Sequence, residues 1–577
     1  MNVIGFKGAK CKNCYKCVRV CEVKAICVKD EQAQIIHEKC IYCGHCLEAC
    51  PQNAKTYISD LDRVKQYIKD GEKVVISLAP SYKGVLKFDK PGQVITALLK
   101  LGFFQVRETA EGAVYVSREY ERLMAEGEMD NIITTCCPSA NKLVEIYYPD
   151  LVPYMAPVVS PMIAHGRLLK KEMGSDIKVV FLGPCISKKS EAESDPRTRG
   201  AVDAVINFTE LEQWMSEEGI AFADLEETPF HNPNPRVNRL YPVTGGILTS
   251  VMTERKFENY RKFYVHGIEN CIELLRSMQR GEVHGCFIEI NVCNGGCIKG
   301  PAVNYNADGF SRFKIKLDMQ ESIPADPVTK EEYPEQEPEI FAKPFMNLAP
   351  EEKFPSEQQI REILAKTGKL DKKDELNCGA CGYSSCREKA IAVFQGKAEL
   401  TMCIPYMHEK AQSMANTVLD TTPNVIIVAD AEMRIVEFSH AAEIMFHKTR
   451  QQAMEMFLFE FIDPADFEHV LQTHENIHGK KVTYDELGKT TLQNIIYIEK
   501  SNCVMGTFQD VTMEEEKAQQ SYKLKVDTIE MAQNVIDKQM KVAQEIAGLL
   551  GETTAETKVT LTQLRDMILF EGDVESE

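Results

Sequence analysis

The sequence has no long apolar run and no excess of basic charge. None of its apolar stretches approaches the ~20 residues that a membrane-spanning helix needs, and the start, MNVIGFKGAKCKNC, lacks the apolar core of a secretory signal. We therefore expect a cytoplasmic protein that does not contact a membrane. A net charge of −19 argues against nucleic acid as a partner, because phosphate binding needs a basic face.

Cysteine, by contrast, is abundant, with 21 residues in a chain of 577. The cytoplasm keeps thiols reduced, so closely spaced cysteines indicate metal ligands rather than disulfides. The length is too great for one hydrophobic core, so several domains are expected. Apolar runs alternate with helical patterns along much of the chain, which predicts a multidomain fold of α+β and α/β parts. We expect a cysteine-rich segment (1–60), an α/β domain (70–325), a linker (326–372), a second cysteine-rich domain (373–412), a small α/β domain (413–513) and a helical tail (514–577).

The first segment repeats the spacing C-x2-C-x2-C-x3-C. In two-cluster ferredoxins, three cysteines at this spacing bind one 4Fe-4S cluster and the fourth crosses to the other cluster. By this resemblance one cluster takes Cys11, Cys14, Cys17 and Cys50, and the other takes Cys21, Cys40, Cys43 and Cys46. The alternative is a pair of zinc knuckles, which seldom place eight cysteines in this repeated order. Cys27 lies outside the pattern and is expected to be a packed thiol.

Four apolar stretches of the central domain are typical of buried parallel strands that each run into a short loop. They are KVVISL, NIITT, KVVFL and CFIEI, and the loops after them carry Ser81, Cys136 with Cys137, Cys185, and Cys293. Open α/β sheets place ligands outside the carboxyl ends of their strands, so these loops are expected to converge on one site. The residues alone indicate a buried metal site.

These loops resemble the three signature motifs of iron–iron hydrogenases. TTCCP (134–138) resembles the first motif, GPCISKKSE (183–191) the second, and IEINVCNGGC (288–297) the third. Upstream, 79–81 is similar to a loop that faces the active site in that family. The likeness covers roughly residues 74–305 in the family's order, and the ordered set is far more specific than any single motif.

The resemblance implies an H-cluster, which is a 4Fe-4S cube joined to a two-iron unit with CO, cyanide and a bridging azadithiolate. The cube would be held by Cys137, Cys185, Cys293 and Cys297, and Cys297 would also bridge to the two-iron unit. Lys188 would bind a cyanide and Ser81 would lie against the two-iron unit. Cys136 would relay protons to the amine of the dithiolate, with Glu119 further along the relay. Without Cys185 nearby, Lys188 and Glu191 would be interpreted as a solvated helix start.

Several positions depart from the family's pattern. Gly183 and Asn291 stand where methionines precede the cysteines of the second and third motifs, and Met162 replaces a glutamine. One glutamate of the proton path falls on Val116, and Ala156 replaces a relay serine. Because such residues surround the two-iron unit or supply it with protons, we expect altered cofactor properties and slow turnover.

A further set of four cysteines, at 378, 381, 386 and 403, follows the linker. The set resembles the small iron–sulfur domain of corrinoid iron–sulfur proteins, and Gly379 and Gly382 allow a tight wrap around a cluster. We expect Cys378, Cys381, Cys386 and Cys403 to hold a 4Fe-4S cluster, and a zinc site is the alternative. A helix is expected in REKAIAVFQGKAEL. Cys271 and Cys286, in the central domain, are expected in the core.

Residues 416–446 resemble the opening of a PAS domain, with strands in NVIIVAD and RIVEFS. The segment 508–512 resembles its end, where a signalling helix begins. His440 is expected to be a surface or helix-cap residue rather than a haem ligand. In the tail, Val535, Val542 and Leu549 recur every seven residues, which predicts an amphipathic helix that could pair two chains as a homodimer.

The architecture resembles the sensory branch of iron–iron hydrogenases. We predict an H2 sensor with weak H2-oxidising and proton-reducing activity, which sends electrons through its clusters to a PAS-linked output. Its partners would be H2 and protons, a redox partner such as ferredoxin, and a kinase or phosphatase acting in trans. One alternative is a working ferredoxin-dependent hydrogenase. The other is an iron–sulfur redox sensor that never receives the two-iron unit, as in Narf-like relatives.

Overall fold

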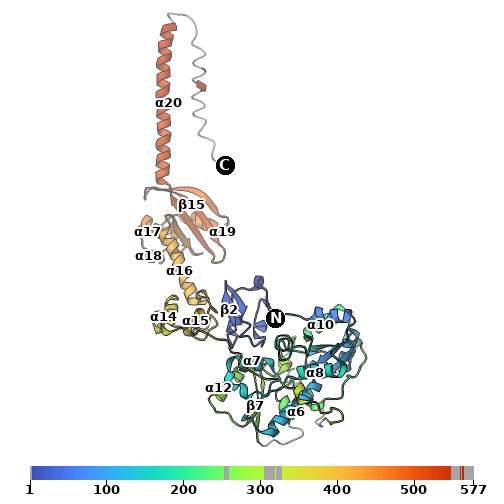
Figure 1. Ribbon diagram of the computed structural model, residues 1–577. Helices are drawn as coiled ribbons and strands as arrows, with labels where there is room; N and C mark the ends of the chain where they lie inside the picture. The colour runs from blue at the N-terminus through green and yellow to red at the C-terminus, as the bar shows by residue number, and fades with distance from the viewer. Residues whose placement is uncertain are drawn as a thin grey trace. The chain divides into compact units, whose positions relative to one another are not determined.

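The structure is a computed structural model that describes residues 3–251, 259–303 and 328–547, with isolated positions at 317, 319, 559, 562 and 563. The chain divides into two compact units, residues 1–407 and 408–577 (Figure 1). Both mix helices and strands, so the predicted fold class is confirmed. Within the described ranges, no helix combines the length and the apolar character needed to cross a bilayer.

The cysteine-rich start folds into two antiparallel strand pairs and two one-turn helices. The pairs are β1 (Ile4–Phe6) with β4 (Lys55–Tyr57) and β2 (Ile26–Lys29) with β3 (Gln32–Ile35), and the helices are α1 (Lys16–Arg19) and α2 (His45–Glu48). The sequence repeat is a structural repeat as well. Each helix is preceded by a residue in the left-handed region, Tyr15 at φ 54° and Gly44 at φ 85°. Each helix also carries the third cysteine of its repeat, Cys17 or Cys46.

The next part contains two parallel sheets. One has the order β6-β5-β8-β9, with β5 Val74–Leu78, β6 Gln105–Glu108, β8 Lys178–Leu182 and β9 Ala204–Ile206. The other has the order β10-β11-β7, with β7 Asn131–Ile133, β10 Arg261–His266 and β11 Cys286–Asn291. All four predicted strands are present. They divide between the two sheets, β5 and β8 in the first and β7 and β11 in the second.

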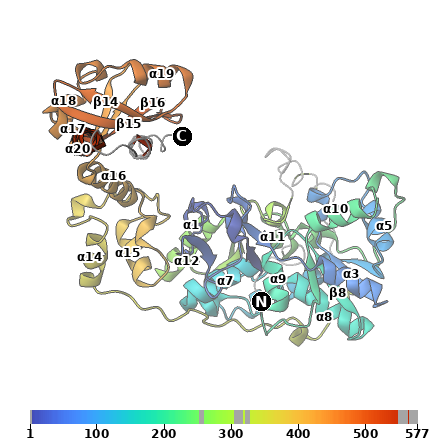
Figure 2. The same ribbon diagram turned by 90° about the horizontal axis from the view of Figure 1, so that it is seen from above.

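Helices cover both sheets (Figure 2). They are α3 (Leu61–Lys69), α4 (Tyr82–Val85), α5 (Gly92–Lys100), α6 (Ala110–Glu126), α7 (Pro138–Tyr147), α8 (Pro161–Met173), α9 (Ser187–Glu193), α10 (Phe208–Glu217), α11 (Gly246–Val251) and α12 (Ile268–Gln279). The helix predicted after Pro138 is α7, which has proline in its first turn, where no backbone donor is lost. One apolar core fills the first sheet and its helices, and a second core fills the other sheet.

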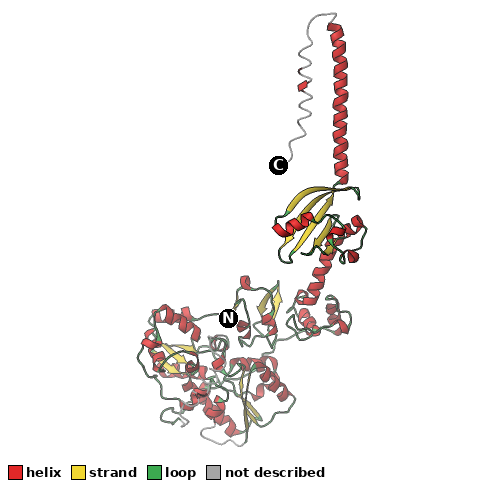
Figure 3. Cartoon of the chain, turned by 180° about the vertical axis from the view of Figure 1, so that it is seen from behind, coloured by secondary structure: helices red, strands yellow, loops and turns green. Residues whose placement is uncertain are grey.

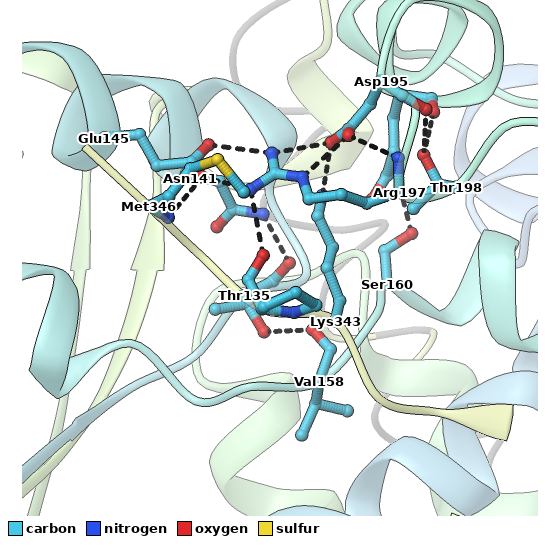
Figure 4. Close-up of polar contacts among 12 residues, drawn as sticks. Thr135, Asn141, Glu145, Val158, Ser160, Asp195, Arg197, Thr198, Lys343 and Met346 are labelled. Carbon is cyan, nitrogen blue, oxygen red and sulfur yellow. Dashed lines mark hydrogen bonds and ion pairs between the residues drawn. The ribbon is translucent and has the colours of Figure 1, made fainter. Parts of the chain in front are cut away.

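A strap from the predicted linker, residues 338–349, is anchored on the domain that contains the two parallel sheets by buried charges (Figure 4). The Lys343 ammonium pairs with Asp195 at 2.9 Å, and Arg197 bonds both Asp195 and Glu145. Met346 donates its backbone N–H to Glu145 at 3.2 Å. These contacts are largely shielded from water, because the Lys343 side chain is only 3% exposed. The linker is therefore packed on the domain at this point.

The first unit ends in a small helical part beside the ferredoxin-like segment (Figures 1 and 2). It contains α14 (Glu357–Ala365), α15 (Cys386–Phe394) and the start of α16 (Ile404–Thr421). Its residues share one apolar cluster with Val18, Ile26 and Val28 of the cysteine-rich start.

The second unit is a five-stranded antiparallel sheet with short helices packed against it (Figure 3). The strand order is β13-β12-β16-β15-β14, with β12 Val425–Ala429, β13 Ile435–Phe438, β14 Ile477–Tyr484, β15 Lys489–Ile498 and β16 Cys503–Asp510. The helices are α17 (His440–Phe446), α18 (Arg450–Ala453) and α19 (Ala465–Thr473), and α20 (Thr512–Ala547) follows β16. The strands predicted in NVIIVAD and RIVEFS are thus confirmed. Of the predicted heptad positions, Leu549 lies outside the described residues.

Candidate functional site

The four predicted loops meet at one cavity. Its volume is about 80 Å³, and its lining includes Ser81, Cys136, Cys185, Lys188, Asn291 and Cys297. All four strands that precede these loops, β5, β7, β8 and β11, end in buried residues. The convergence expected from the carboxyl ends of parallel strands therefore occurs, although two sheets contribute to it.

Four thiols beside this cavity lie close enough to affect one another electrostatically. Burial, and then the charges of Cys185, Cys137, Cys297 and Cys43, raises the pKa of Cys293 well above its usual value. Burial together with Cys185 and Cys137 likewise raises the pKa of Cys297. A site that brings several thiols together in a buried place suits a metal cluster, which takes thiolates and neutralises them.

Ser81 has a buried hydroxyl without a protein partner. Its side chain is fully buried, its Oγ makes no hydrogen bond, and it lines the cavity. A buried polar atom that lacks a partner costs free energy unless a ligand satisfies it. This atom therefore fits a polar group bound in the cavity.

Lys188 points its ammonium into the same space. The Nζ atom donates to Glu191 Oε2 at 2.8 Å and to the backbone oxygen of Cys136 at 3.1 Å. Glu191 also accepts a hydrogen bond from Ser160 at 2.8 Å and is 2% exposed. The interpretation of this segment as a solvated helix start is thereby excluded. An ammonium group has three N–H donors, and these two contacts use two of them. One donor of Lys188 therefore remains for a ligand in the cavity.

Cys136 contacts a tyrosine that sequence reasoning missed. The Tyr120 hydroxyl lies 3.3 Å from the Cys136 sulfur and accepts a hydrogen bond from the backbone N–H of Thr135 at 2.9 Å. Burial raises the pKa of Cys136 to about 12, so its thiol stays protonated at working pH. Tyr120 and Cys136 are sixteen residues apart in the sequence, and no motif predicts that they make contact.

The predicted relay residue Glu119 is not among the residues that line the cavity. Its carboxylate accepts a hydrogen bond from Arg122 at 2.9 Å, on the same helix. Val116, which stands where the family has a second glutamate, is fully buried in the apolar core. Of the side chains named here, none is an acid that could pass a proton from Glu119 to Cys136.

Two of the departures from the family's pattern have a visible structural basis. A side chain at Gly183 would place its Cβ 2.6 Å from the ring of Phe181, so this ring occupies the space. Phe181 also lines the cavity. Asn291 is 5% exposed and donates to Glu289 Oε1 at 3.2 Å. Glu289 in turn accepts backbone N–H groups at the start of α11, for example from Ile247 at 3.0 Å.

The cysteines of the first segment group in the crossed order that the ferredoxin resemblance implies. Burial, followed by smaller effects of the charges of Cys11, Cys14 and Cys50, raises the pKa of Cys17. Burial, followed by smaller effects of the charges of Cys43, Cys40 and Cys21, raises the pKa of Cys46. Cys21 thus lies with the second repeat and Cys50 with the first.

The last four cysteines line a separate cavity together with two buried lysines. Cys378, Cys381, Cys386 and Cys403 all border it, as do Lys369 and Lys389. Burial lowers the pKa of Lys389, and the charges of Cys403, Cys381 and Cys386 act in the opposite direction. Lys369 donates to the Cys403 sulfur at 3.4 Å. Four thiols with two ammonium groups suit an anionic cluster.

The remaining cysteines behave as packing residues. Cys27, Cys271, Cys286 and Cys503 are buried, and the first three were expected to be. His440 is exposed and bonds Glu443 at 2.8 Å at the start of α17, as expected for a surface residue, and the helix cap is Ser439. Across the described ranges, no three His, Cys, Asp or Glu side chains could together hold a single metal ion.

Comparison with known families identifies the parts of the chain. Residues 72–301 match the iron only hydrogenase large subunit, C-terminal domain. Residues 33–56 match a 4Fe-4S binding domain, 374–405 an Fe-S cluster family, and 413–511 the PAS fold.

Several curated proteins are similar over about half of this chain. Iron hydrogenase 1 of Clostridium pasteurianum is 27% identical over 46% of this chain, and the match spans 64% of that protein, just under two thirds. The periplasmic [Fe] hydrogenase large subunit of Nitratidesulfovibrio vulgaris is 28% identical over 52% of this chain and 86% of its own length. The cytosolic Fe-S cluster assembly factor NAR1 of Yarrowia lipolytica is 22% identical over 52% of this chain and 82% of its own length.

Solved structures of [FeFe]-hydrogenase HydA1 from Chlamydomonas reinhardtii are also similar. One is 20% identical, with a TM-score of 0.43, and covers 51% of this chain and all of the solved one. By the family matches, residues 72–301 resemble the iron-only hydrogenase large subunit, in a chain whose other segments match 4Fe-4S, Fe-S cluster and PAS families.

Proposed function

We propose that this chain is an H2-sensing iron–iron hydrogenase with low, reversible H2-oxidising and proton-reducing activity. The observation that carries the proposal is the cavity where Ser81, Lys188 and Cys297 meet. The PAS domain in the same chain supports a signalling role, because a turnover enzyme has no need of one.

The residues around the cavity fit an H-cluster. Cys137, Cys185, Cys293 and Cys297 would hold its cube, and the unpartnered Ser81 hydroxyl and the third Lys188 donor would meet its two-iron unit. When bound, that unit supplies an open metal site and an adjacent amine base for H2 chemistry. Apolar side chains, among them Met162 and Phe181, line part of the cavity and limit the access of water.

The side chains of this chain have distinct roles in that setting. Glu191 and the Cys136 carbonyl orient the Lys188 ammonium toward the cavity. Cys136 holds a proton on its sulfur, beside the Tyr120 hydroxyl, and exchanges it with a base in the cavity. Because Val116 is apolar and Glu119 is paired with Arg122, proton supply beyond Cys136 is poor, which favours sensing over fast turnover.

Two alternatives have support of their own. A ferredoxin-dependent hydrogenase is favoured by the similarity to working hydrogenases. An iron–sulfur protein without the two-iron unit is favoured by the similarity to the assembly factor NAR1. The presence of Cys136, Lys188 and the four cube cysteines supports loading of the two-iron unit.

Infrared spectra of the full chain, recorded after maturation with the two-iron precursor, test the proposal. We expect CO and cyanide bands that change under H2, together with weak turnover. High turnover with ferredoxin would favour the working enzyme, and the absence of bands would favour the unloaded protein. Cys297→Ala is the matched control, because it removes the bridging thiol and should abolish the bands.

A further inference from the structure

The most unusual charged groups outside the hydrogenase cavity are the two buried lysines of the last cysteine domain. Lys369 is 9% exposed and Lys389 is 6% exposed, and both border the cavity formed by Cys378, Cys381, Cys386 and Cys403. Lysine is rarely buried unless it is paired with an opposite charge. Their recorded acceptors are carbonyl and hydroxyl oxygens and one sulfur, and no carboxylate is recorded among the described residues.

Lys369 makes the direct contact. Its Nζ atom donates to the Cys403 sulfur at 3.4 Å and is steadied by the backbone oxygen of Thr367 at 3.0 Å. Lys389 is held by the backbone oxygen of Leu400 at 2.9 Å. Both ammonium groups are therefore fixed beside the thiols by backbone oxygens, which do not neutralise them.

The ferredoxin-like ligands have a different environment. The recorded hydrogen bonds to Cys21, Cys40 and Cys50 come from neutral backbone N–H groups, those of Ala25, Tyr42 and Ala54. Two lysines of that segment are buried: Lys39 pairs with the Glu352 carboxylate, and Lys55 donates to the backbone oxygen of Ala33 at 2.6 Å rather than to a thiol. A charge-assisted bond from an ammonium stabilises added negative charge more than a neutral bond does.

The two cluster domains are in direct contact. A side chain at Gly382 would meet Val18 at 2.7 Å, and Arg19 donates to the backbone oxygen of Ala380 at 2.9 Å. Tyr383 lies between the cysteine sets, since burial and then the charges of Cys381, Cys27 and Cys21 raise its pKa. On the other side of the ferredoxin-like segment, a side chain at Gly44 would meet Pro301 of the hydrogenase domain at 2.5 Å.

We propose that Lys369 and Lys389 raise the reduction potential of the cluster held by Cys378, Cys381, Cys386 and Cys403 above the potentials of the ferredoxin-type clusters. This inference rests on the proposed iron–sulfur function. Hydrogen bonds to cluster sulfurs and nearby positive charge stabilise the reduced, more negative state. An electron in the first unit therefore resides by preference beside Cys403, the residue directly before α16.

The electron balance is simple. Oxidation of one H2 releases two protons and two electrons, and each 4Fe-4S cluster accepts one electron. The first electron reduces the cluster beside the lysines, and the second reduces a ferredoxin-type cluster. A signal that starts when the cluster beside Cys403 is reduced therefore needs less H2 than the reduction of all clusters in the chain.

Potentiometric titration monitored by electron paramagnetic resonance tests the inference on the reconstituted full chain, without maturation. In the wild type, the signal that Cys378→Ala removes should appear at the highest potential. Lys369→Gln and Lys389→Gln should each lower its equilibrium constant for reduction about tenfold, which is 59 mV for a one-electron couple. The signals of the other clusters should not move.

Lys366→Gln is the matched control, because it removes the same charge from an exposed position near the domain, where water screens it. Lys369→Arg keeps the charge and should retain the wild-type potential. If Lys369→Gln fails to assemble the cluster, Lys389→Gln decides the question. The inference is wrong if both glutamine variants titrate like Lys366→Gln, or if the cluster is the last to be reduced. Bound zinc with no signal to remove would instead overturn the iron–sulfur assignment itself.

Discussion

At the scale of single residues, the pair Gly183 and Phe181 decides the shape of the hydrogenase cavity. The missing methionine at 183 leaves no empty space, because the Phe181 ring occupies the place where its Cβ would be. Phe181 is also one of the residues that line the cavity. The Phe181 ring thus fills the space beside Gly183, which a likeness to the motif alone does not reveal.

This pairing predicts how methionine can be restored. Gly183→Met alone should lower the free energy of unfolding by about 1–3 kcal/mol, because it overpacks a filled core. Adding Phe181→Ala should recover part of that loss and move the infrared bands of the matured protein toward those of hydrogenases with methionine here. Thermal unfolding of the wild type, both single variants and the double variant measures the coupling. Additive effects would show that the ring and the methionine do not compete.

The residues that could be predicted are those whose spacing is fixed by cluster chemistry. The first and last cysteine sets follow from their spacing, whereas the four cube cysteines of the central domain, Ser81 and Lys188 follow from a likeness to family motifs. Tyr120 and Lys369 could not be found in this way. Each reaches its sulfur from an element distant in sequence, 16 residues from Cys136 and 34 from Cys403, and only the folded chain brings them together.

At the scale of elements, the four strands were predictable because each is a short, continuous apolar run. Their division into two sheets was not, since periodicity says nothing about which strand pairs with which. The strap was also missed. Its proline- and glutamate-rich sequence is typical of a linker, yet Lys343 pairs with Asp195 on the hydrogenase domain.

The strap predicts a localised loss of stability. Asp195→Asn removes the carboxylate shared by Arg197 and Lys343. Arg197 keeps Glu145, but the buried Lys343 ammonium loses its carboxylate partner, which should cost about 3 kcal/mol. Proteolysis should then cut the segment 338–349 faster. Glu335→Gln is the control, because its partner Lys330 is 77% exposed and such pairs contribute at most about 1 kcal/mol.

The pH dependence of the same variant is an independent check. Arg197 and Lys343 hold the pKa of Asp195 far below its ordinary value, with burial acting in the opposite direction. A depressed pKa stabilises the folded state above the unfolded pKa of about 3.9, and this stability is lost as the pH falls below it. The wild type should therefore lose its advantage over Asp195→Asn in acid. Equal stability of the two proteins at neutral pH would mean that the strap is not held by this carboxylate.

At the scale of the whole molecule, sixteen of the 21 cysteines are assigned to four clusters. The reconstituted chain should therefore bind about sixteen irons before maturation, four for each cluster. Iron and zinc analysis of the full chain, beside Cys378→Ala, measures this count. Saturation near eight irons with bound zinc would remove the last cysteine domain and part of the ferredoxin-like segment from the iron–sulfur assignment.

The proposed sensing role requires that sensing can be separated from turnover. A sensor needs equilibrium with H2, whereas a turnover enzyme needs rapid proton exchange. Cys136 is the residue whose substitution should affect rapid proton exchange without preventing equilibrium with H2. It borders the cavity but is not one of the four cube cysteines, and burial keeps its thiol protonated, with a pKa of about 12 rather than the ordinary 8.5.

Cys136→Ala should therefore leave the clusters and the two-iron unit in place, lower turnover further, and slow H2-dependent cluster reduction without abolishing it. Cys297→Ala should abolish both, because it removes a thiol that holds the cofactor. H2 turnover and cluster reduction under H2, measured side by side in the two variants, distinguish the roles. If Cys136→Ala keeps full turnover, Cys136 is only a packed thiol beside Tyr120, and protons reach the cavity by another route. If it loses the redox response completely while its infrared bands persist, sensing requires the same proton exchange as turnover, and the two functions are not separable in this chain.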